Sequence, residues 1–421
     1  MCTIIIFCNF APNSAATANG LQWHRQQTQS RNAIQSDNTS SEHDMNRPFV
    51  YGAAVAGENF TDRVRDTRRL TLDFENGMNA ILISPRRMGK TSLVAKVCEG
   101  FAHRSDIKVV CMDIYDCRTE YDFLNRFAST IMKEAAGKLD LVASTVKEFL
   151  ARLVPTIKYS LDPAQEFSIS LGITPELYKP EEILNLPEMI ARKRNIHIVV
   201  CMDEFQQVGE FADTIDVQKR MRGVWQHHKM ASYCMFGSKK HLMMNIFQNK
   251  RMPFYKFGDT IFLEKIPDDD WVAFIKARFA AKGKTISDDF AQRICRTVDG
   301  YSSYVQEFAW DVFCETDDAV DEEAFNAGYT ELLRQNSALF QSKMEPLTAY
   351  QLNFLRAICN GVHSDYGSKQ ISSAYNIGTK SNITRLKTAL EDKELIETVK
   401  GQTYISDPVF EQWLKREYMW M

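Results

Sequence analysis

The chain has 421 residues, and this length predicts two or three domains. Its hydrophobic share of 44% and its charged share of 25% are typical of soluble globular proteins. The net charge of −3 excludes a uniformly basic nucleic-acid-binding protein, so any such site would be a local patch. The ten cysteines include no CxxC pair, which argues against zinc and redox motifs and favours buried, reduced thiols in a cytoplasmic protein.

The first 44 residues differ in composition from the rest of the chain. An apolar stretch at 2–10 has no Lys or Arg before it and is too short to span a bilayer. Residues 12–44 are rich in Asn, Ser, Thr, Gln and Ala and lack hydrophobic periodicity. We therefore expect residues 1–44 to be a disordered extension, as translation from an upstream start codon would produce. No other apolar run reaches membrane-spanning length, so no membrane contact is expected.

Residues 45–266 alternate short apolar runs with longer stretches of helical spacing. This alternation predicts an α/β fold in which helices cover both faces of a parallel sheet. The predicted strands are 79–85, 108–115, 195–205, 232–238 and 260–266, and the predicted helices are 90–103 and 120–136. Residues 157–173 alternate differently and predict a hairpin insertion.

The remaining chain predicts two further units. Residues 267–340 contain helical segments that begin with acidic or polar residues, and the first of them ends at Gly283, so we expect a helical lid. Residues 341–421 predict three helices, then a strand, a turn at Lys400-Gly401 and a second strand, which is the order of a winged helix-turn-helix. We expect no internal repeats.

Residues 84–91 read SPRRMGKT and follow the first predicted strand directly. A P-loop has the pattern G-x-x-x-x-G-K-[ST] between a buried strand and a helix, and its backbone N–H groups bind phosphates. Ser84 replaces the first glycine and fits if its φ stays negative. Lys90 is expected to bind the β- and γ-phosphates of ATP, and Thr91 to bind Mg²⁺. The expected nucleotide-binding residues of this loop are Ser84, Pro85, Arg86, Arg87, Met88, Gly89, Lys90, Thr91 and Ser92.

A second motif, IHIVVCMDEFQ at 196–206, is an apolar strand that ends in Asp203 and Glu204. In P-loop NTPases an Asp at this place holds Mg²⁺, and a neighbouring polar residue orients the attacking water. Buried strands that end in an acidic turn are common, but the two motifs in this order, with another strand between them, favour a Mg·ATP site. We therefore predict that Thr91 and Asp203 bind Mg²⁺ and that Glu204 is catalytic.

Several segments carry a family resemblance beyond these two motifs. They read NRPFVYG, ENFTDRVRDTRRL, ILISPRRMGKTSL, CMDEFQ, FGSKKHLM, PFYKFG, DGYSSYVQEF and ISDPVFEQWL. Through them, the chain from Asn46 onward resembles the archaeal-type ATPase family of AAA+/STAND P-loop proteins. The first P-loop position of that family is often not glycine, so the resemblance implies that SPRRMGKT is a working variant.

The resemblance also implies roles for three residues outside the two motifs. The family's F-x-x-R box ends here at Arg63, which is expected on the adenine side of the nucleotide. Ser238, at the tip of the fourth predicted strand, corresponds to the residue that senses the γ-phosphate. Arg251, just before the fifth predicted strand, lies where such proteins often place an arginine finger, although an exposed arginine without a catalytic role fits equally well.

The expected winged helix leaves the partner open. Its second helix carries Lys380, Arg385 and Lys387, which suit contact with DNA phosphates and bases. Acidic residues follow closely and balance this charge, so contact with a protein is an equal alternative. Three functions fit: an ATP-controlled switch, a DNA-binding regulator with structural nucleotide, and a defence or signalling ATPase acting on a protein. A homo-oligomer is compatible with each.

Overall fold

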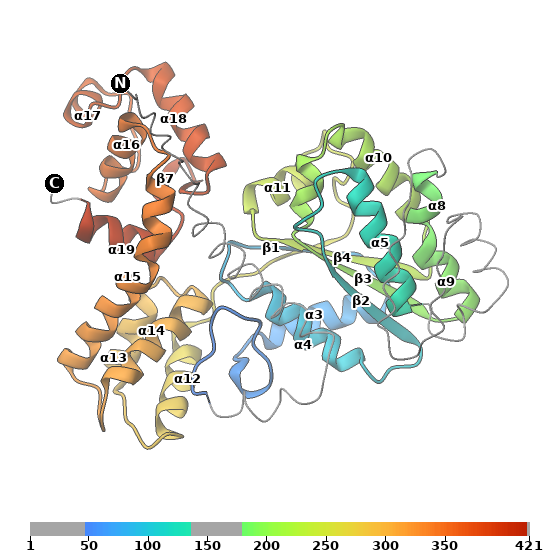
Figure 1. The fold of residues 1–421 in the computed structure, drawn as a ribbon, viewed down its shortest axis with the longest axis horizontal. Coiled ribbons are helices and arrows are strands. Elements are labelled where there is room, and N and C mark those ends of the chain that lie inside the picture. The colour runs from blue at the N-terminus through green and yellow to red at the C-terminus, as the bar shows by residue number, and fades with distance from the viewer. Residues whose placement is uncertain (1–46, 136–178, 419–421) are drawn as a thin grey trace, which may run out of the picture.

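The computed structural model describes residues 47–135 and 179–418 (Figure 1). The expected extension at 1–44 and the expected hairpin at 157–173 lie outside these residues. Two halves lie side by side in the described chain: a sheet covered by helices, and a column of helices that includes a small two-stranded sheet. Within the described residues, no helix is both long and apolar enough to cross a bilayer.

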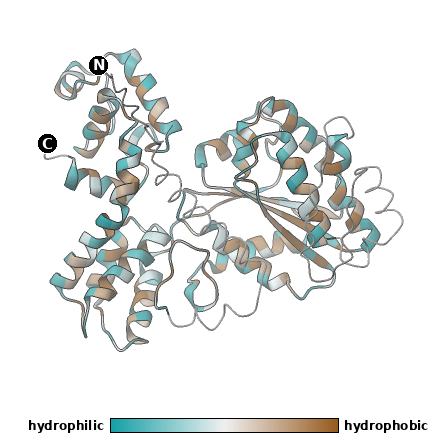
Figure 2. Cartoon of the chain, in the orientation of Figure 1, coloured by the Kyte–Doolittle hydropathy of each residue, from teal (hydrophilic) through white to brown (hydrophobic). Residues whose placement is uncertain are grey.

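Five strands form one sheet, in the order β2-β3-β4-β1-β5, and every neighbouring pair is parallel. They are β1 (Ala80–Ile83), β2 (Ile107–Asp113), β3 (His197–Asp203), β4 (Ala231–Gly237) and β5 (Asp259–Phe262). Each observed strand falls within or next to a predicted one, and Figure 2 shows the central strands as largely apolar. The predicted α/β class is confirmed, because continuous apolar strands need cover on both faces.

Successive residues of β1 point into two separate cores. Ala80 and Leu82 pack in the core that contains α3 and α4, whereas Ile81 and Ile83 pack in the core on the opposite face. The helices of the first face are α3 (Val64–Glu75) and α4 (Lys90–Phe101). The helices of the second face are α5 (Glu120–Ala135), α8 (Pro180–Leu184), α9 (Leu186–Arg194), α10 (Thr214–Trp225) and α11 (Lys240–Gln248). Two short 3₁₀ helices, η1 (Gly57–Asn59) and η2 (Phe205–Glu210), complete this half.

The helical column begins directly after β5. Its helices are α12 (Asp268–Ala280), α13 (Asp288–Thr297), α14 (Ser302–Glu315) and α15 (Glu322–Met344). Side chains satisfy the free N–H groups at two of the helix starts, since Ser287 Oγ accepts a bond from the Phe290 N–H and Asp321 Oδ1 accepts one from the Ala324 N–H. α15 is one continuous helix that passes through residue 340, where the sequence predicted the lid to end.

Asp311 on α14 is buried beneath α15 and supplies a stability prediction. Its Oδ1 accepts a bond from Gln335 Nε2 at 3.1 Å, and burial, with the nearby Glu307 and Glu331 carboxylates, raises the pKa of Asp311 to about 7. A folded-state pKa above the unfolded value means that stability from this group is greatest at low pH and is lost as pH rises. Asp311→Asn is therefore expected to gain stability over the wild type between pH 4 and pH 8, by roughly 1–3 kcal/mol.

Chemical denaturation at several pH values measures this gain. Asp317→Asn is the matched control, because Asp317 lies exposed just beyond the same helix. A constant difference between Asp311→Asn and the wild type at every pH would contradict the predicted burial of an ionising carboxyl group.

The last unit contains the three predicted helices and the predicted hairpin. They are α16 (Ala349–Cys359), α17 (Lys369–Tyr375), α18 (Lys380–Asp392), β6 (Ile396–Val399) and β7 (Gln402–Ile405). A final helix, α19 (Pro408–Glu417), was not predicted. It packs on the end of α15, where the rings of Phe340 and Phe410 lie 5.2 Å apart and Trp413 Nε1 donates to Ser337 Oγ at 3.1 Å. These aromatic contacts attach the winged helix to the helical column.

Candidate functional site

The P-loop connects β1 to α4 at the carboxyl edge of the sheet. Gly89 precedes the first residue of α4 with a φ of 86°, in the left-handed region that favours glycine. A Cβ at Gly89 would meet no atom within 4 Å, so the backbone conformation, and not lack of space, calls for glycine here. This turn leaves the N-terminal N–H groups of α4 at the loop, which is the arrangement that binds phosphate.

Lys90 is buried at the base of this loop. Its Nζ donates to the carbonyl oxygens of Ser84 at 3.0 Å and Pro85 at 2.8 Å, and to Ser84 Oγ at 3.2 Å. Burial lowers the pKa of Lys90 to about 8, against the opposing effect of the Asp203 and Glu204 carboxylates. The ammonium group is thus held at the loop by neutral oxygens.

Ser84 fits the place of the first P-loop glycine. Its φ is not among the positive values, so a side chain causes no backbone strain. The hydroxyl is buried, donates to the Pro85 carbonyl at 3.1 Å and accepts the bond from Lys90. The serine therefore helps to position the lysine, which supports the interpretation of SPRRMGKT as an intact loop.

The predicted magnesium ligands meet at the ends of α4 and β3. Thr91 Oγ1 donates to Asp203 Oδ2 at 3.0 Å, and Asp203 Oδ1 accepts a bond from the Glu204 N–H at 2.8 Å. Burial, followed by the charges of Glu204 and Asp113, raises the pKa of Asp203 to about 7. Asp113 is the direct neighbour of Asp203 in the sheet. A hydroxyl and carboxylates are the hard oxygen ligands that suit Mg²⁺.

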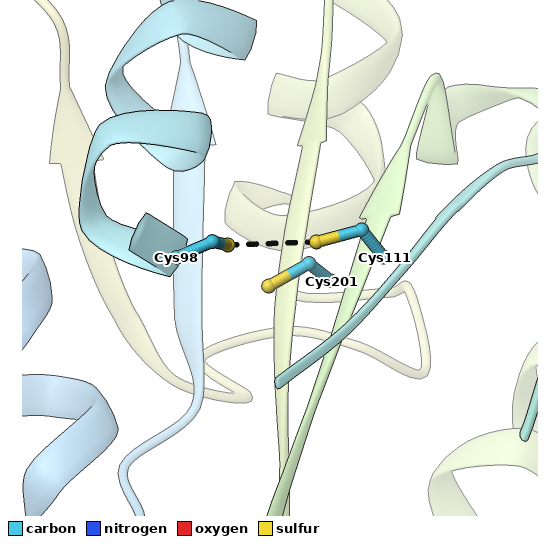
Figure 3. A group of neighbouring side chains, drawn as sticks. All are labelled: Cys98, Cys111 and Cys201. Carbon is cyan, nitrogen blue, oxygen red and sulfur yellow. Dashed lines mark hydrogen bonds between the residues drawn. The ribbon is translucent and has the colours of Figure 1, made fainter. Parts of the chain in front are cut away.

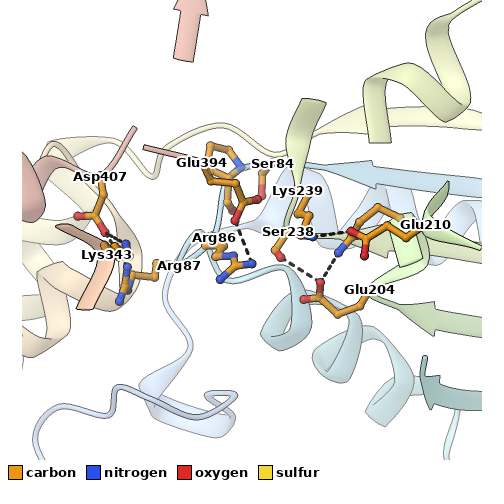
Figure 4. A network of polar contacts seen from close by, with 12 residues as sticks. Ser84, Arg86, Arg87, Glu204, Glu210, Ser238, Lys239, Lys343, Glu394 and Asp407 are labelled. Carbon is orange, nitrogen blue, oxygen red and sulfur yellow. Dashed lines mark hydrogen bonds and ion pairs between the residues drawn. The ribbon is translucent and has the colours of Figure 1, made fainter. Parts of the chain in front are cut away.

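Glu204 and Ser238, predicted from separate parts of the sequence, contact each other (Figure 4). Glu204 has a φ of 56°, and its Oε2 accepts bonds from Ser238 Oγ at 3.0 Å and from Gln206 Nε2. Gly237 makes this packing possible, because a Cβ there would come within 1.8 Å of Gln206 Oε1. The carboxylate is thereby oriented beside the P-loop strand, as a residue that positions a water molecule must be.

Two predicted nucleotide contacts have protein partners in this structure. The Arg63 side chain is buried and donates to the carbonyl oxygens of Met88 at 3.0 Å and of Glu264, so it supports the P-loop from behind. Ser92 Oγ accepts the Val55 N–H at 3.0 Å and so holds the segment before α3. An adenine contact of Arg63 and a nucleotide contact of Ser92 remain predictions.

Arg251 lies exposed on the loop between α11 and β5. Among the described residues, no hydrogen bond or ion pair joins its side chain to the P-loop, and its backbone N–H donates to Asn249 Oδ1 at 3.1 Å. A finger role would therefore require a second copy of the chain. That role also remains a prediction.

The two P-loop arginines contact the winged helix (Figure 4). Arg86 Nη2 lies 3.0 Å from Glu394 Oε2, just after α18, and Arg87 Nη1 donates to Asp407 Oδ2 at 2.8 Å, just before α19. The Arg87 guanidinium also lies 4.4 Å from the ring centre of Tyr304, whose hydroxyl donates to the same Asp407 oxygen at 2.9 Å. Charged side chains on the phosphate-binding loop are thus neutralised by carboxylates of the last unit.

This interface was not predicted from the sequence. Glu397 adds a further ion pair across it, with Lys240 Nζ at 3.4 Å, and Lys343 lies 3.9 Å from Asp407. Two of the acidic residues that weakened the DNA-binding interpretation, Glu394 and Glu397, therefore face the half that contains the parallel sheet. Lys380 and Arg385, in contrast, are exposed on α18.

Comparison with known proteins found a family profile over the last unit and solved structures of similar fold. The profile of a family described as a probable winged helix domain matches residues 338–416. No curated protein matches the sequence. A Walker-type ATPase of Pyrococcus abyssi is similar in structure, with a TM-score of 0.62 and 18% identity over 88% of this chain and 99% of that one. The ORC2 protein of Aeropyrum pernix, in ADPNP–ADP complexes, follows with a TM-score of 0.53 and 13% identity over 85% and 95%.

The chain shares the fold of these two solved structures, an AAA+-like parallel sheet covered by helices, and this sheet is followed by a winged helix. At these identities the likeness concerns the fold. The archaeal-type resemblance seen in the sequence is confirmed at that level, and the predicted order of parallel-sheet body, helices and winged helix agrees with it. In the AAA+-type fold of this chain, the P-loop, Asp203, Glu204 and Ser238 lie together at one edge of the sheet.

Proposed function

We propose that this protein is a Mg·ATP-dependent switch whose winged helix is held on the P-loop until nucleotide binds. One observation carries the proposal: Arg86 and Arg87, inside the phosphate-binding loop, are ion-paired with Glu394 and Asp407 of the winged helix. Phosphate oxygens and these carboxylates are alternative partners for the same guanidinium groups. Nucleotide binding and winged-helix docking are therefore coupled.

The residues of the site support both binding and turnover. The N–H groups at the start of α4 and the Lys90 ammonium would hold the phosphates, and Thr91 with Asp203 would hold the magnesium ion. A bound Mg²⁺ supplies positive charge that neutralises the phosphate oxygens. Glu204, oriented by Ser238, would align a water molecule and accept its proton. Hydrolysis would then reset the switch.

Asp407→Asn tests the docking contact. Asp407 Oδ1 caps α19 by accepting the Val409 and Phe410 N–H groups, while Oδ2 contacts Arg87. Asparagine keeps the cap and removes the charge. We expect hydrogen exchange at 394–410 to be faster in this variant without nucleotide, and equally fast in the wild type once a non-hydrolysable ATP analogue and Mg²⁺ are added.

Glu411→Gln is the matched control, because Glu411 lies on α19 and pairs only with Lys415 in the described contacts. It should exchange like the wild type. If the analogue binds to the wild type but hydrogen exchange at 394–410 does not change, the proposed switch is contradicted.

The exposed face of α18 favours DNA as the target of the released winged helix. Lys380, Thr384 and Arg385 are exposed on this face and do not take part in the docking contacts. A salt titration of duplex DNA binding, with and without the ATP analogue, should show affinity that falls steeply with salt and rises with the analogue. Replacing Lys380 and Arg385 by alanine should reduce the salt slope by up to about 2. Absence of binding at low salt would favour a protein partner instead.

A further inference from the structure

Three cysteine thiols from three separate elements meet between α4 and the sheet (Figure 3). Cys98 of α4, Cys111 of β2 and Cys201 of β3 have sulfur atoms that all lie within 4.8 Å of one another. The Sγ atoms of Cys98 and Cys111 are 3.5 Å apart. In the part of the chain that the structure describes, no other group of three His, Cys, Asp or Glu side chains is arranged to hold one ion.

Two identical short segments in neighbouring strands place two of these cysteines side by side. The pentapeptide VVCMD occurs at 109–113 and again at 199–203. The two copies pair residue by residue in the parallel sheet, which makes Cys111 and Cys201 direct neighbours on the same face. Cys98 approaches that face from α4. The proximity of the thiols therefore follows from strand register and could not be found from CxxC spacing.

The distances between the three sulfur atoms are compatible with binding of one metal ion. Thiolates bound to a single Zn²⁺ at about 2.3 Å lie roughly 3.8 Å apart in a tetrahedral site. The observed separations, 3.5 Å for one pair and at most 4.8 Å for the others, bracket this value. Cys98 and Cys111 are half-buried while Cys201 is fully buried, so an ion could enter from one side and be shielded on the other.

The thiolate is the form that binds metal, so the three thiols would release their protons to solvent as the ion binds. Cys234 extends the row on β4, in register with Cys201, but is not part of the three-sulfur group.

We propose that Cys98, Cys111 and Cys201 form a three-thiolate site for one soft cation, Zn²⁺ or Cu⁺. The bound ion would connect α4 to β2 and β3. Cys98 lies about two turns after Lys90 on the same helix, and Cys201 lies two residues before Asp203. The site would fix the helix of the P-loop relative to the strand of the magnesium ligand, where Thr91 and Asp203 meet.

Metal binding to the full chain tests this site without relying on ATPase activity. Reduced protein, freed of metal and kept anaerobic, would be titrated with Cd²⁺ as an ultraviolet probe of thiolate bonds. The wild type should bind one strongly held equivalent, and Cys98→Ala and Cys111→Ala should each lower the affinity at least tenfold. Cys314→Ala is the control and should bind like the wild type, because Cys314 is exposed on α14.

X-ray absorption of the wild type loaded with one equivalent of Zn²⁺ gives a second readout that needs no variant to fold. We expect three sulfur neighbours at about 2.3 Å. A shell made mainly of nitrogen and oxygen would overturn the proposal. Equal Cd²⁺ binding by the wild type and both alanine variants, or a Cys98–Cys111 disulfide as the only product of the cluster in protein that binds no metal, would overturn it as well.

Discussion

Lys90→Ala is expected to lower ATP turnover and ATP affinity by about 100-fold or more, equivalent to about 2.7 kcal/mol. Lys90 is the buried cation at the start of α4, and its Nζ is already bonded to the loop oxygens of Ser84 and Pro85. Alanine removes both the charge that faces the phosphates and the bonds that shape the loop. Phosphate release and calorimetric titration with ATP measure the two effects.

Lys96→Ala is the matched control for this prediction. Lys96 lies on the same helix, but its side chain is 40% exposed and pairs with Glu99. Its replacement should leave turnover within about twofold of the wild type, because exposed ion pairs contribute little. Undiminished ATP binding in a folded Lys90→Ala variant would refute the assignment of the P-loop.

Glu204→Gln should separate binding from hydrolysis. Glutamine keeps the size of the side chain and an oxygen that can accept the Ser238 hydroxyl, but it cannot accept a proton from water. We expect turnover to fall by about 10²–10⁴-fold while ATP affinity stays within a few-fold of the wild type. Single-turnover hydrolysis and equilibrium binding should be measured on the same preparation.

Glu210→Gln provides the comparison for this variant. Glu210 is the last residue of the 3₁₀ helix η2, which begins directly after Glu204, and it pairs with Lys239 at 2.6 Å, outside the contact between Glu204 and Ser238. It should turn over ATP at nearly the wild-type rate. If Glu204→Gln also keeps the wild-type rate, the protein hydrolyses ATP without this carboxylate, and the predicted catalytic role is wrong.

Local sequence was sufficient for the parts of the site that depend on a strand, a turn and a helix. The apolar run before Ser84 and the glycine before Lys90 predicted the loop, and the apolar run before Asp203 predicted the second strand end. Because parallel strands end at one edge of the sheet, these residues were expected on the same edge. Thr91 and Asp203 do lie there, in contact at 3.0 Å.

Contacts between remote elements could not be predicted in this way. The partners Arg87 and Asp407 are separated by 320 positions, and nothing in the sequence around either residue indicates that the two are in contact. The same holds for Arg63. Its buried guanidinium binds backbone carbonyl oxygens, and every residue has such an oxygen, so the sequence does not indicate which residues it contacts. For Cys111 and Cys201 a signal did exist, since the identical VVCMD segments indicated two equivalent strands.

The long helix α15 gives the molecule a mechanical property. Its 23 residues form one uninterrupted rod, about 34 Å long, that packs on α14 at one end and on α19 at the other. Pivoting such a rod by about 10° at its first turn would carry its far end through roughly 6 Å. That travel is about twice the length of the Arg87–Asp407 ion pair. A small rotation at the start of α15 would thus be enough to separate Arg87 from Asp407.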